Sequence, residues 1–300
     1  MSLVCSKFKT PLMVNSERCH ETKAVYNPTV IKKDAKIYML YRAESHNGIT
    51  GTIGLAWSED GIHFVKHPEP VLVPDSEYDE EGCEDPRVVA FDNTYYMSYV
   101  PKGKGANGTE IALAASSDLF HWTKLGLIDL PRSDWCSEKV KAPVIAPIRV
   151  NGKYVMYFMG QKRSWHSAVG VAYSDDLIHW VEDNRNPVLT PRYSHLDCLG
   201  LEPGATPILL HDQLVLFYNA WDETFTHRTW YSAFDMCDPG RLAARDDQPI
   251  LTPEYSWECS GYVKNIIFTE GAMLHNNQLY LYYGASDTSI GLALCNPQHI

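Results

Sequence analysis

Acidic, basic and amide side chains stand at the start of several apolar stretches of this sequence, where burying them is costly unless they are bonded. Several carboxylates with cations between them suit a polar, polyhydroxylated ligand, and paired carboxylic acids are the usual means of cleaving a glycosidic bond. One acid protonates the departing oxygen, and the second group attacks the sugar or activates water. The residues concerned are Asn27, Glu84, Asp85, Arg87, Lys141, Glu202 and Asn265.

Each of these residues belongs to a short corner motif that recurs along the chain roughly every 60 residues, a period typical of repeat architectures. After each corner comes a tight turn rich in Asn, Asp and Gly, then a strand of alternating aromatic and aliphatic residues, which together indicate a β-hairpin. A further strand follows, and its Ser58, Ser116, Ser174 and Ser232 stand 58 residues apart. The corners are YNPTV (26–30), EDPRV (84–88), KAPVI (141–145), EPGATPI (202–208) and KNIIF (264–268).

Four of the five units close with a short extended run, such as PVLVP at 70–74 or QPILTP at 248–253, and the fifth has none. The run PLMV at 11–14 resembles these closing runs and precedes the first corner. We therefore predict an all-β fold, a five-bladed β-propeller over residues 1–300 in which an N-terminal strand closes the last blade. Two stacked β-sandwich domains are the rival fold, but they would not keep one 58-residue phase throughout.

In a propeller the first strand of each blade faces the central channel, so the five corners converge on one small volume. Because the corners differ from blade to blade, they favour one asymmetric central site over repeated shallow ones. Aromatic rings near the blade turns could stack on sugar faces, whereas the rings and imidazoles of the repeated S-x-D-x-x-H-W turn are interpreted as structural. The first group is Trp57, Trp165, Trp221, Trp230 and Trp257, and the second is Trp122, Trp180, His121 and His179.

The charge balance argues against a polyanionic partner. There are 26 Lys and Arg against 37 Asp and Glu, a formal charge of −11, which repels nucleic acid. The first ten residues, MSLVCSKFKT, lack the apolar core of a signal peptide, and no apolar stretch approaches the ~18 residues of a spanning helix. We expect a cytoplasmic protein that binds neither nucleic acid nor membrane.

The eight cysteines show no C-x-x-C pair and no His partner at zinc-finger spacing, so a structural metal site is not expected. A chain of this length needs no disulfide to fold, and free thiols are the preferred interpretation. No motif calls for a metal or an organic cofactor.

The run GCEDPRVV, together with DPGRL and YYGASD downstream, resembles family 130 of the glycoside hydrolases over about residues 26–294. The resemblance implies a five-bladed propeller acting on β-mannosides, either by phosphorolysis or by hydrolysis. Asp85 matches the family's catalytic acid, which passes its proton through a hydroxyl of the mannose ring. The positions that match the sugar subsite are Asn27, Arg42, Glu84, Arg87 and Asp287. Lys141, Asn219 and Glu258 are also predicted to bind the substrate.

The sequence departs from the phosphorylase pattern, which resembles K-I-G-x-G-P-P-P-I followed by Y-H-G. Here GLEPGATPI and YNA place Gly200 at the Lys position and Asn219 at the His position, so two phosphate-binding cations are missing. A carboxylate at Glu202 would repel phosphate but could activate water. We therefore predict an inverting hydrolase with Asp85 on the acid side and Glu202 as the base. Glu223 and Glu258 are reserve bases, and Glu202 could instead be salt-bridged to Lys141 or Arg87.

Other functions stay open at this point. A phosphorylase that releases mannose 1-phosphate could bind inorganic phosphate through Lys141, Lys102 or Lys104, and the substrate would again be a manno-oligosaccharide or related β-mannoside. A non-catalytic sugar-binding propeller is a second alternative, because fold does not fix function. An arabinan- or xylan-active enzyme is a third, although Lys141 stands where such enzymes would carry an acid.

Overall fold

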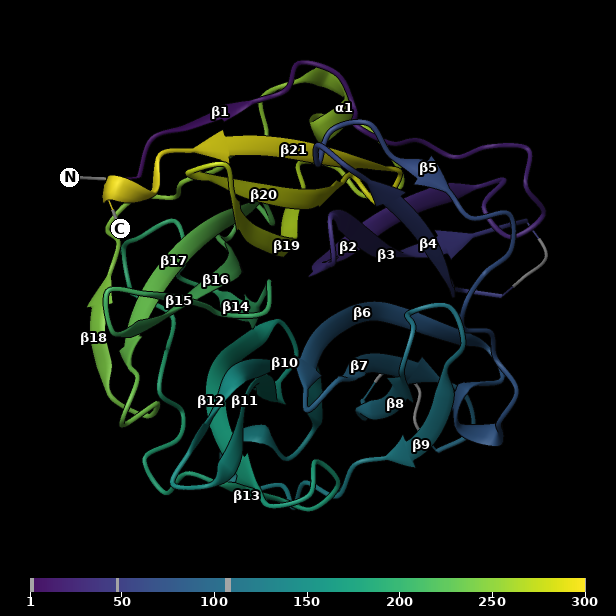
Figure 1. Ribbon diagram of the computed structural model, residues 1–300. Helices are drawn as coiled ribbons and strands as arrows, with labels where there is room; N and C mark the ends of the chain where they lie inside the picture. The colour runs from purple at the N-terminus through teal and green to yellow at the C-terminus, as the bar shows by residue number, and fades with distance from the viewer. Residues whose placement is uncertain (1–2, 47–48, 106–108, 300) are drawn as a thin grey trace.

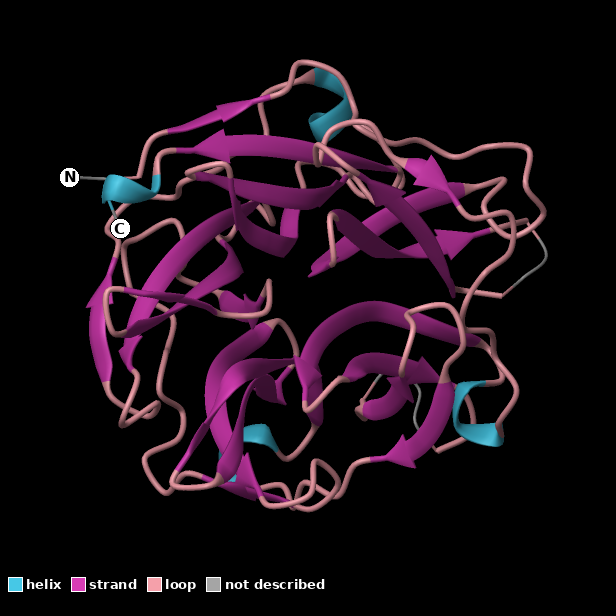
Figure 2. Ribbon diagram, viewed as in Figure 1, coloured by secondary structure: helices cyan, strands magenta, loops and turns pink. Residues whose placement is uncertain are grey.

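The computed structural model describes residues 3–46, 49–105 and 109–299, and there the chain forms five antiparallel sheets arranged in a ring (Figure 1). Nearly all of the regular structure is strand (Figure 2). The five-bladed β-propeller predicted from the repeats is therefore confirmed, and the sandwich alternative is excluded. Within the described ranges, no helix is long and apolar enough to span a membrane.

Each blade is one sheet whose strands run in chain order from the central channel outward, apart from the last. Blade 1 holds β2 (Ala24–Lys33), β3 (Lys36–Glu44), β4 (Thr52–Ser58) and β5 (Val65–Lys66). Blade 2 holds β6 (Gly82–Phe91), β7 (Thr94–Lys102), β8 (Ala112–Ser116) and β9 (Thr123–Leu127). Blade 3 holds β10 (Lys139–Val150), β11 (Lys153–Arg163), β12 (His166–Ser174) and β13 (Trp180–Glu182).

Blade 4 holds β14 (Gly200–Pro203), β15 (Ile208–Leu210), β16 (Gln213–Trp221), β17 (His227–Asp235) and β18 (Leu242–Arg245). Blade 5 holds β19 (Ile267–His275), β20 (Gln278–Ala285), β21 (Ser289–Cys295) and, from the other end of the chain, β1 (Cys5–Lys7). In the part of the chain that the structure describes, the helical segments are the short α1 (Ser256–Cys259) and three 3₁₀ turns, Glu77–Asp79, Asp134–Cys136 and Pro297–His299.

The hairpin between the first two strands of each blade turns on residues with positive φ, as the Asn, Asp and Gly content predicts. The third strand of blades 1 to 3 ends in the repeated Ser-x-Asp-x-x-His turn. In blade 2, Oδ1 of Asp118 accepts from the backbone N–H groups of Phe120 and His121, both at 2.8 Å, and Ser116 Oγ accepts from Leu119 N. The His121 ring bonds Oδ2 of Asp118, and Trp122 Nε1 donates to Leu119 O, which confirms the structural role of this turn.

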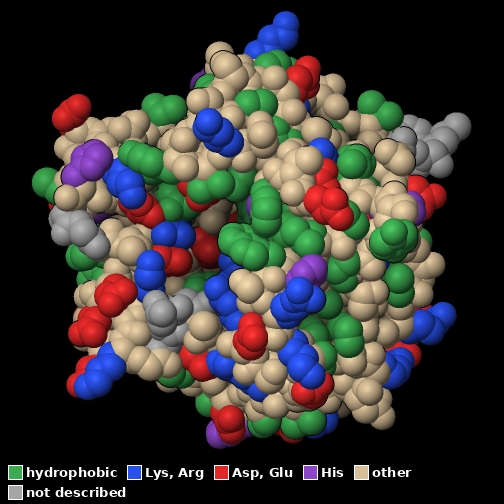
Figure 3. Space-filling model, turned by 180° about the vertical axis from the view of Figure 1, so that it is seen from behind, with side chains coloured by type: hydrophobic (Ala, Val, Ile, Leu, Met, Phe, Trp, Pro, Cys, Tyr) green, Lys and Arg blue, Asp and Glu red, His purple; other side chains and the backbone are tan. Residues whose placement is uncertain are grey.

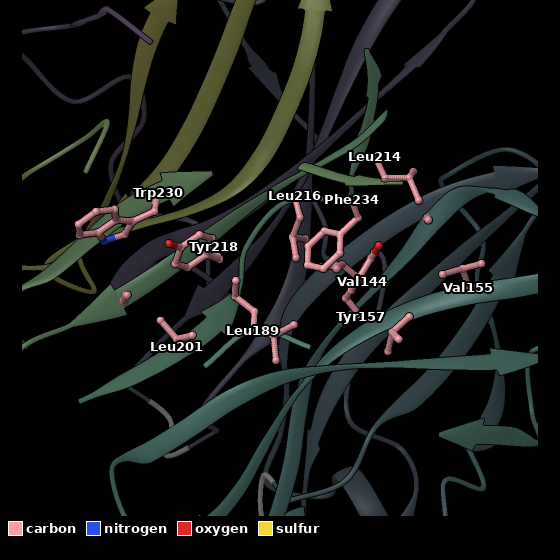
Figure 4. Close-up of a cluster of buried hydrophobic side chains, with 14 residues drawn as sticks. Val144, Val155, Tyr157, Leu189, Leu201, Leu214, Leu216, Tyr218, Trp230 and Phe234 are labelled. Atoms are coloured by element: carbon pink, nitrogen blue, oxygen red, sulfur yellow. The ribbon is translucent and has the colours of Figure 1, made fainter. Parts of the chain in front are cut away.

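The core lies between neighbouring blades, where apolar faces of adjacent sheets pack together. Figure 4 shows the cluster between blades 3 and 4, in which Tyr157 and Phe234 pack with ring centroids 4.9 Å apart. The Tyr157 hydroxyl donates to Pro239 O, so this buried polar atom is bonded. Burial of such faces on both sides of every blade fixes the relative positions of the blades around the channel.

The ring is closed by the N-terminus, as predicted, but the closing strand differs from the predicted one. The ladder with β21 is formed by β1, with Cys5 opposite Cys295 and Lys7 opposite Ala293. The run at 11–14 makes only a bridge, Met13 to Ile290. It matches the closing runs of blades 1, 3 and 4, which likewise make single bridges, such as Ile53 to Leu72. The outermost strands of blades 1, 3 and 4 are β5, β13 and β18, and the closing runs come after them in the chain. The prediction that the closing runs are themselves the outermost strands was therefore wrong for these blades.

The expectation that all cysteines are free was also wrong. Cys5 and Cys295 form a disulfide across the register pair that joins β1 to β21. The two residues are 290 positions apart in the sequence, so no local spacing could reveal the pair. The other six cysteines are free thiols.

Candidate functional site

A pocket of about 310 Å³ opens where the innermost strands begin, and all five blades contribute to it. Figure 3 shows a hollow near the centre of one face, where charged side chains meet a group of hydrophobic ones. The pocket contains four carboxylates and three cationic side chains. It is lined by Tyr26, Asn27, Arg42, Glu84, Asp85, Lys139, Lys141, Met159, Gln161, Trp165, Glu202, Trp221, His227, Ile266, Phe268 and Asp287.

A bulge in the first strand positions the polar residues of blades 1 and 2. Asn27 and Asp85 both have φ of 51°, each precedes a proline, and the β2–β3 and β6–β7 registers shift there. Asn27 Nδ2 donates to Asp85 Oδ1 at 2.7 Å, which links the two blades. Gly284 makes room for this contact, since a Cβ there would lie 2.5 Å from Asn27 Oδ1. The glycine of the Y-Y-G-A-S-D run is therefore needed to pack the pocket.

Arg42 neutralises the acidic side of the pocket. Its Nη2 lies 2.7 Å from Glu44 and 2.8 Å from Glu84, and its Nη1 lies 3.4 Å from Asp85. These carboxylates raise the pKa of Arg42 further, although burial alone would lower it. One guanidinium thus serves three carboxylates, an arrangement suited to its planar fork of donors.

Asp85, the candidate acid, has a carboxyl pKa below its ordinary value. Burial alone would raise the pKa of its carboxyl, but the positive charges of Arg42, Lys141 and Arg87 outweigh burial and hold the pKa below its ordinary value. To act as an acid, this group must gain a proton when substrate occupies the pocket.

Glu202 lies in the same pocket as Asp85, on blade 4, with Lys141 of blade 3 beside it. Lys141 Nζ is 3.0 Å from Glu202 Oε1, so the salt bridge considered in the sequence analysis is present. Burial would lower the pKa of Lys141, but Glu202 and Asp85 raise it above its ordinary value. Lys139 also lines the pocket, and the described residues offer its ammonium no carboxylate at salt-bridge distance. Burial and the charge of Lys141 lower the pKa of Lys139.

Asp287, in the turn between β20 and β21, completes the acidic set. Burial raises the pKa of its carboxyl to about 6, and the charges of Asp85 and Glu44 add to this, while Arg42 and Lys141 oppose it. A small fall in pH below neutral would therefore begin to protonate this carboxylate.

Blades 3 to 5 contribute most of the aromatic residues of the pocket, beside the charged groups described above. The rings of Trp221 and His227 lie 4.9 Å apart, and that of Phe268 lies 6.0 Å from His227. Burial lowers the pKa of His227 to about 4, so its imidazole is neutral near pH 7. Of the five tryptophans proposed to stack on sugar, Trp165 and Trp221 line this pocket; the others lie elsewhere, and Trp230 is fully buried in the core.

Arg87 does not line the pocket; it is 1% exposed and paired with Glu270 of blade 5, which is 0% exposed. Its Nη1 donates to Glu270 Oε2 at 2.7 Å, and its Nε donates to Gly204 O of blade 4. Arg87 thus ties blades 2, 4 and 5 together, which places it behind the site rather than in it.

Glu270 was missed by the sequence analysis, which placed the fifth corner at Asn265. The register shift of blade 5 falls between Thr269 and Gly271, whereas Asn265 precedes β19. Counting back from the hairpin turns would have come within one residue of it. Asp85 lies seven residues before the turn at Asp92, and the same count from Asn276 reaches Thr269, next to Glu270.

Asn219 and Glu258 also lie outside the pocket lining. The Asn219 amide bonds Thr269 N at 2.9 Å and Thr269 O at 3.0 Å, which joins blades 4 and 5. Glu258 is fully buried near the outer strand of blade 5, where its carboxylate accepts from Lys7 and from the Tyr283 hydroxyl. The remaining charged or amide candidates outside the lining are Asn265, Glu223, Lys102 and Lys104.

Gly200 occupies the position expected to hold a phosphate-binding lysine in phosphorylases. A Cβ at this residue would lie 2.3 Å from the Trp221 ring and 2.8 Å from Trp165 O. The indole of Trp221 therefore fills the space that a longer side chain at position 200 would need. No group of three or more His, Cys, Asp or Glu is placed to hold a metal ion within the described ranges.

Comparison with known proteins gives consistent matches over the whole chain. A family profile described as beta-1,4-mannooligosaccharide phosphorylase matches residues 5–300. The 1,2-beta-oligomannan phosphorylase of Thermoanaerobacter sp. (strain X514) is 32% identical over 97% of this chain and 96% of its own.

Two solved structures are similar throughout. One is described by the statement that the GH130 family of mannoside phosphorylases contains glycoside hydrolases that target beta-1,2 mannosidic linkages in Candida mannan. It has a TM-score of 0.86 and 29% identity, and the match covers 99% of this chain and 94% of that one. The beta-1,2-mannobiose phosphorylase of Listeria innocua has a TM-score of 0.85 over 99% and 98% of the two chains. At 21% identity, it supports the fold alone.

Proposed function

Since the chain belongs to glycoside hydrolase family 130, whose members act on β-mannosides, we propose that it hydrolyses β-linked mannosides with inversion. The observation that carries this proposal is that Glu202 lines the same pocket as Asp85. Asp85 supplies the proton to the departing oxygen, through a hydroxyl of the bound sugar, and Glu202 activates the attacking water. The single propeller that spans the chain carries the whole site.

The surroundings of Glu202 favour water over phosphate as the attacking group. A phosphate dianion would enter a pocket that already contains four carboxylates. Arg42 is shared among carboxylates, and Lys141 is paired with Glu202, so these cations are already engaged. The Trp221 ring occupies the space that a lysine side chain at position 200 would need, and the amide of Asn219 is bonded to Thr269. Neither position therefore offers a cation to phosphate.

The polar residues of the pocket suit the sugar whose bond is cleaved. Asn27, Arg42 and Glu84 surround Asp85 and offer both donors and acceptors to sugar hydroxyls. Arg87, Asn219 and Glu258, which the sequence analysis included among the sugar-binding residues, are assigned to the framework instead. Asp287 stays in the proposed subsite.

Product analysis tests the proposal. Purified protein is incubated with β-1,2- and β-1,4-linked manno-oligosaccharides in phosphate-free and phosphate buffers. We expect mannose to be released at the same rate in both, first as the α-anomer, because water attacks opposite the β-bond. The variants Asp85→Asn and Glu202→Gln should each lose about 10²- to 10⁴-fold in kcat while remaining folded.

Glu223→Gln is the discriminating variant, since Glu223 is an exposed acid outside the pocket. It should retain wild-type turnover. Loss of activity in this variant with retention in Glu202→Gln would overturn the assignment of the base. Near-normal turnover in Asp85→Asn would overturn that of the acid.

Phosphorolysis is the second candidate, and it has specific support. Lys139 and Lys141 lie together in the pocket. The matching family profile is described as a phosphorylase, and two relatives that are each 32% identical are named phosphorylases, so the comparisons favour this reaction over hydrolysis. If mannose 1-phosphate appears, and only when phosphate is supplied, then this reaction replaces hydrolysis. Binding of the sugars without turnover in either buffer would favour a non-catalytic propeller.

A further inference from the structure

Two exposed aromatic side chains, Trp165 and Phe225, stand together at the edge of the pocket, and we call them the aromatic platform. Trp165 lies at the tip of the β11–β12 hairpin of blade 3, and Phe225 lies in the β16–β17 connection of blade 4. Their ring centroids are 5.2 Å apart, with the planes at 75°. Trp165 is 56% exposed and Phe225 is 44% exposed, so the platform is not part of a core. Exposed aromatic groups at a pocket edge typically mark binding surfaces.

The platform is held in place by its own loops. Trp165 and Phe225 both have positive φ, 66° and 55°, which bulky residues rarely adopt. Trp165 O accepts from Trp221 Nε1 at 3.3 Å, which fixes the hairpin tip against the pocket wall. Phe225 N donates to Asp222 O at 2.9 Å, and the Asp222 carboxylate is paired with Arg228 at 2.8 Å. The rings are therefore pre-organised for a ligand, which reduces the entropy lost on binding.

The platform adjoins the aromatic residues that blades 3 to 5 contribute to the pocket. Trp165 itself lines the pocket, beside Trp221, while Arg42, Glu84 and Asp85 come from blades 1 and 2. Lys139, Lys141, Glu202 and Asp287 also lie on blades 3 to 5, so charged groups border the aromatic ones there. Figure 3 shows hydrophobic side chains adjoining the charged hollow. A substrate whose scissile bond lies at Asp85 would place one sugar among the charged groups. The rest of the substrate would extend toward the aromatic side.

We infer that Trp165 and Phe225 form the subsite for the leaving-group sugar, which stacks the apolar C–H face of an uncharged hexose on these rings. This inference rests on the proposed function, because it assigns one side of the same pocket to the departing part of a β-mannoside. The subsite selects substrates by the group attached to mannose, and it would act in the same way whether water or phosphate is the attacking group.

Comparison of two substrates tests the platform. β-1,2-Mannobiose has a leaving sugar that can contact the platform, whereas β-mannosyl fluoride releases only fluoride. For Trp165→Ala and Phe225→Ala, the ratio of kcat/KM on mannobiose to kcat/KM on the fluoride should fall about tenfold or more, from loss of stacked apolar area. Trp165→Phe should restore much of the ratio. Tyr193→Ala, which removes a side chain 95% exposed and outside the pocket, is the control and should leave the ratio unchanged.

An equal loss on both substrates would overturn the inference, because it would indicate a structural role for the rings. An unchanged ratio in both alanine variants would overturn it as well. If the alanine variants lose as much kcat/KM on an aryl β-mannoside as on mannobiose, the platform recognises any flat apolar group rather than a sugar, and the inference is overturned.

A binding measurement separates this inference from the proposed function. If the wild type cleaves neither substrate under any condition, the proposed function fails. Calorimetric titration with mannobiose and mannose then tests the platform directly. Wild type should bind mannobiose about tenfold or more tightly than mannose, and Trp165→Ala should lose this difference. Equal affinities for the two sugars in wild type would overturn the platform independently of catalysis.

Discussion

At the scale of single residues, the pocket is a set of charges that are individually costly and mutually compensated. Arg42 contacts Glu84 and Asp85, and Lys141 contacts Glu202, so most of the carboxylates have a cation within salt-bridge distance. Such buried pairs contribute little net stability, since desolvation offsets attraction. Their value is in holding charged groups in one place in the absence of substrate.

Asp287 is the one pocket carboxylate for which the described residues offer no cation at salt-bridge distance, and its titration leads to a prediction. Its folded-state pKa of about 6 lies above the ordinary value of 3.8, so the folded protein binds this proton more tightly than the unfolded chain. Its contribution to stability therefore falls as the pH rises from about 4 to about 6, and the destabilisation is fully present above that range. Asp287→Asn should raise the free energy of unfolding at pH 7.5 by on the order of 2 kcal/mol and change it little near pH 4.

Urea unfolding at both pH values measures this difference, with the exposed Asp212→Asn as control. Asparagine tolerates the positive φ of 54° at position 287, so backbone strain should not obscure the result. A variant equally or less stable than wild type at pH 7.5 would contradict the burial argument. The same variant should lose activity if Asp287 binds the sugar.

At the scale of elements, two local devices position the site. The bulge before a proline places Asn27 and Asp85 at the start of β2 and β6, where they reach the channel. The repeated Ser-x-Asp-x-x-His turn joins the third and fourth strands at the outside of blades 1 to 3. The residues at the bulges differ from blade to blade and contribute to the pocket. The residues of the Ser-x-Asp-x-x-His turn are nearly the same in each of these blades and stabilise the blade.

Asp118 tests the contribution of this turn to stability. Its carboxylate accepts two backbone N–H bonds and contacts the His121 ring. Asp118→Ala should lower the free energy of unfolding by about 1 kcal/mol, as expected for loss of a cap that satisfies backbone donors. His121→Ala removes only an exposed contact and should cost roughly half as much or less.

Thermal and urea unfolding of these two variants provide the measurement, and turnover should be unaffected in both because the turn lies outside the pocket. A larger loss from His121→Ala than from Asp118→Ala would show that the imidazole, not the backbone cap, stabilises the turn.

At the scale of the whole molecule, closure of the ring joins the two ends of the chain. β1 pairs with β21, so the first and last strands of the chain lie side by side in Figure 1. Lys7 of this strand also reaches Glu258 at 2.6 Å, so the closing segment is bonded to α1 as well as to blade 5. The site depends on this closure because blade 5 contributes Phe268 and Asp287 to the pocket.

The Cys5–Cys295 disulfide gives a prediction about closure. Cys5→Ser should lower stability by roughly 2–4 kcal/mol, since the link restricts the unfolded chain over a separation of 290 residues. Denatured, unreduced protein should show six reactive thiols, and reduction should lower the melting temperature of wild type but not of Cys5→Ser.

Cys19→Ser, at an exposed free cysteine, is the matched control and should behave as wild type. Eight reactive thiols before reduction would contradict the assignment of the disulfide.

The sequence by itself determined the architecture and part of the site. The steady phase of Ser58, Ser116 and Ser174, with a hairpin turn in every unit, predicted five blades, because turn chemistry and strand alternation are local properties. The corner motif located Asn27, Asp85, Lys141 and Glu202, all of which line the pocket, because the first strand of every blade must face the channel.

Only the tertiary structure decided the contacts between residues far apart in the chain. The pairing of Arg87 with Glu270 and the disulfide between Cys5 and Cys295 join segments whose separation leaves no local signal. Arg87 matched a sugar-binding position by motif, yet its guanidinium is bonded within the framework. A side chain's role depends on which partners the closed ring brings within reach, and closure is a property of the complete set of blades.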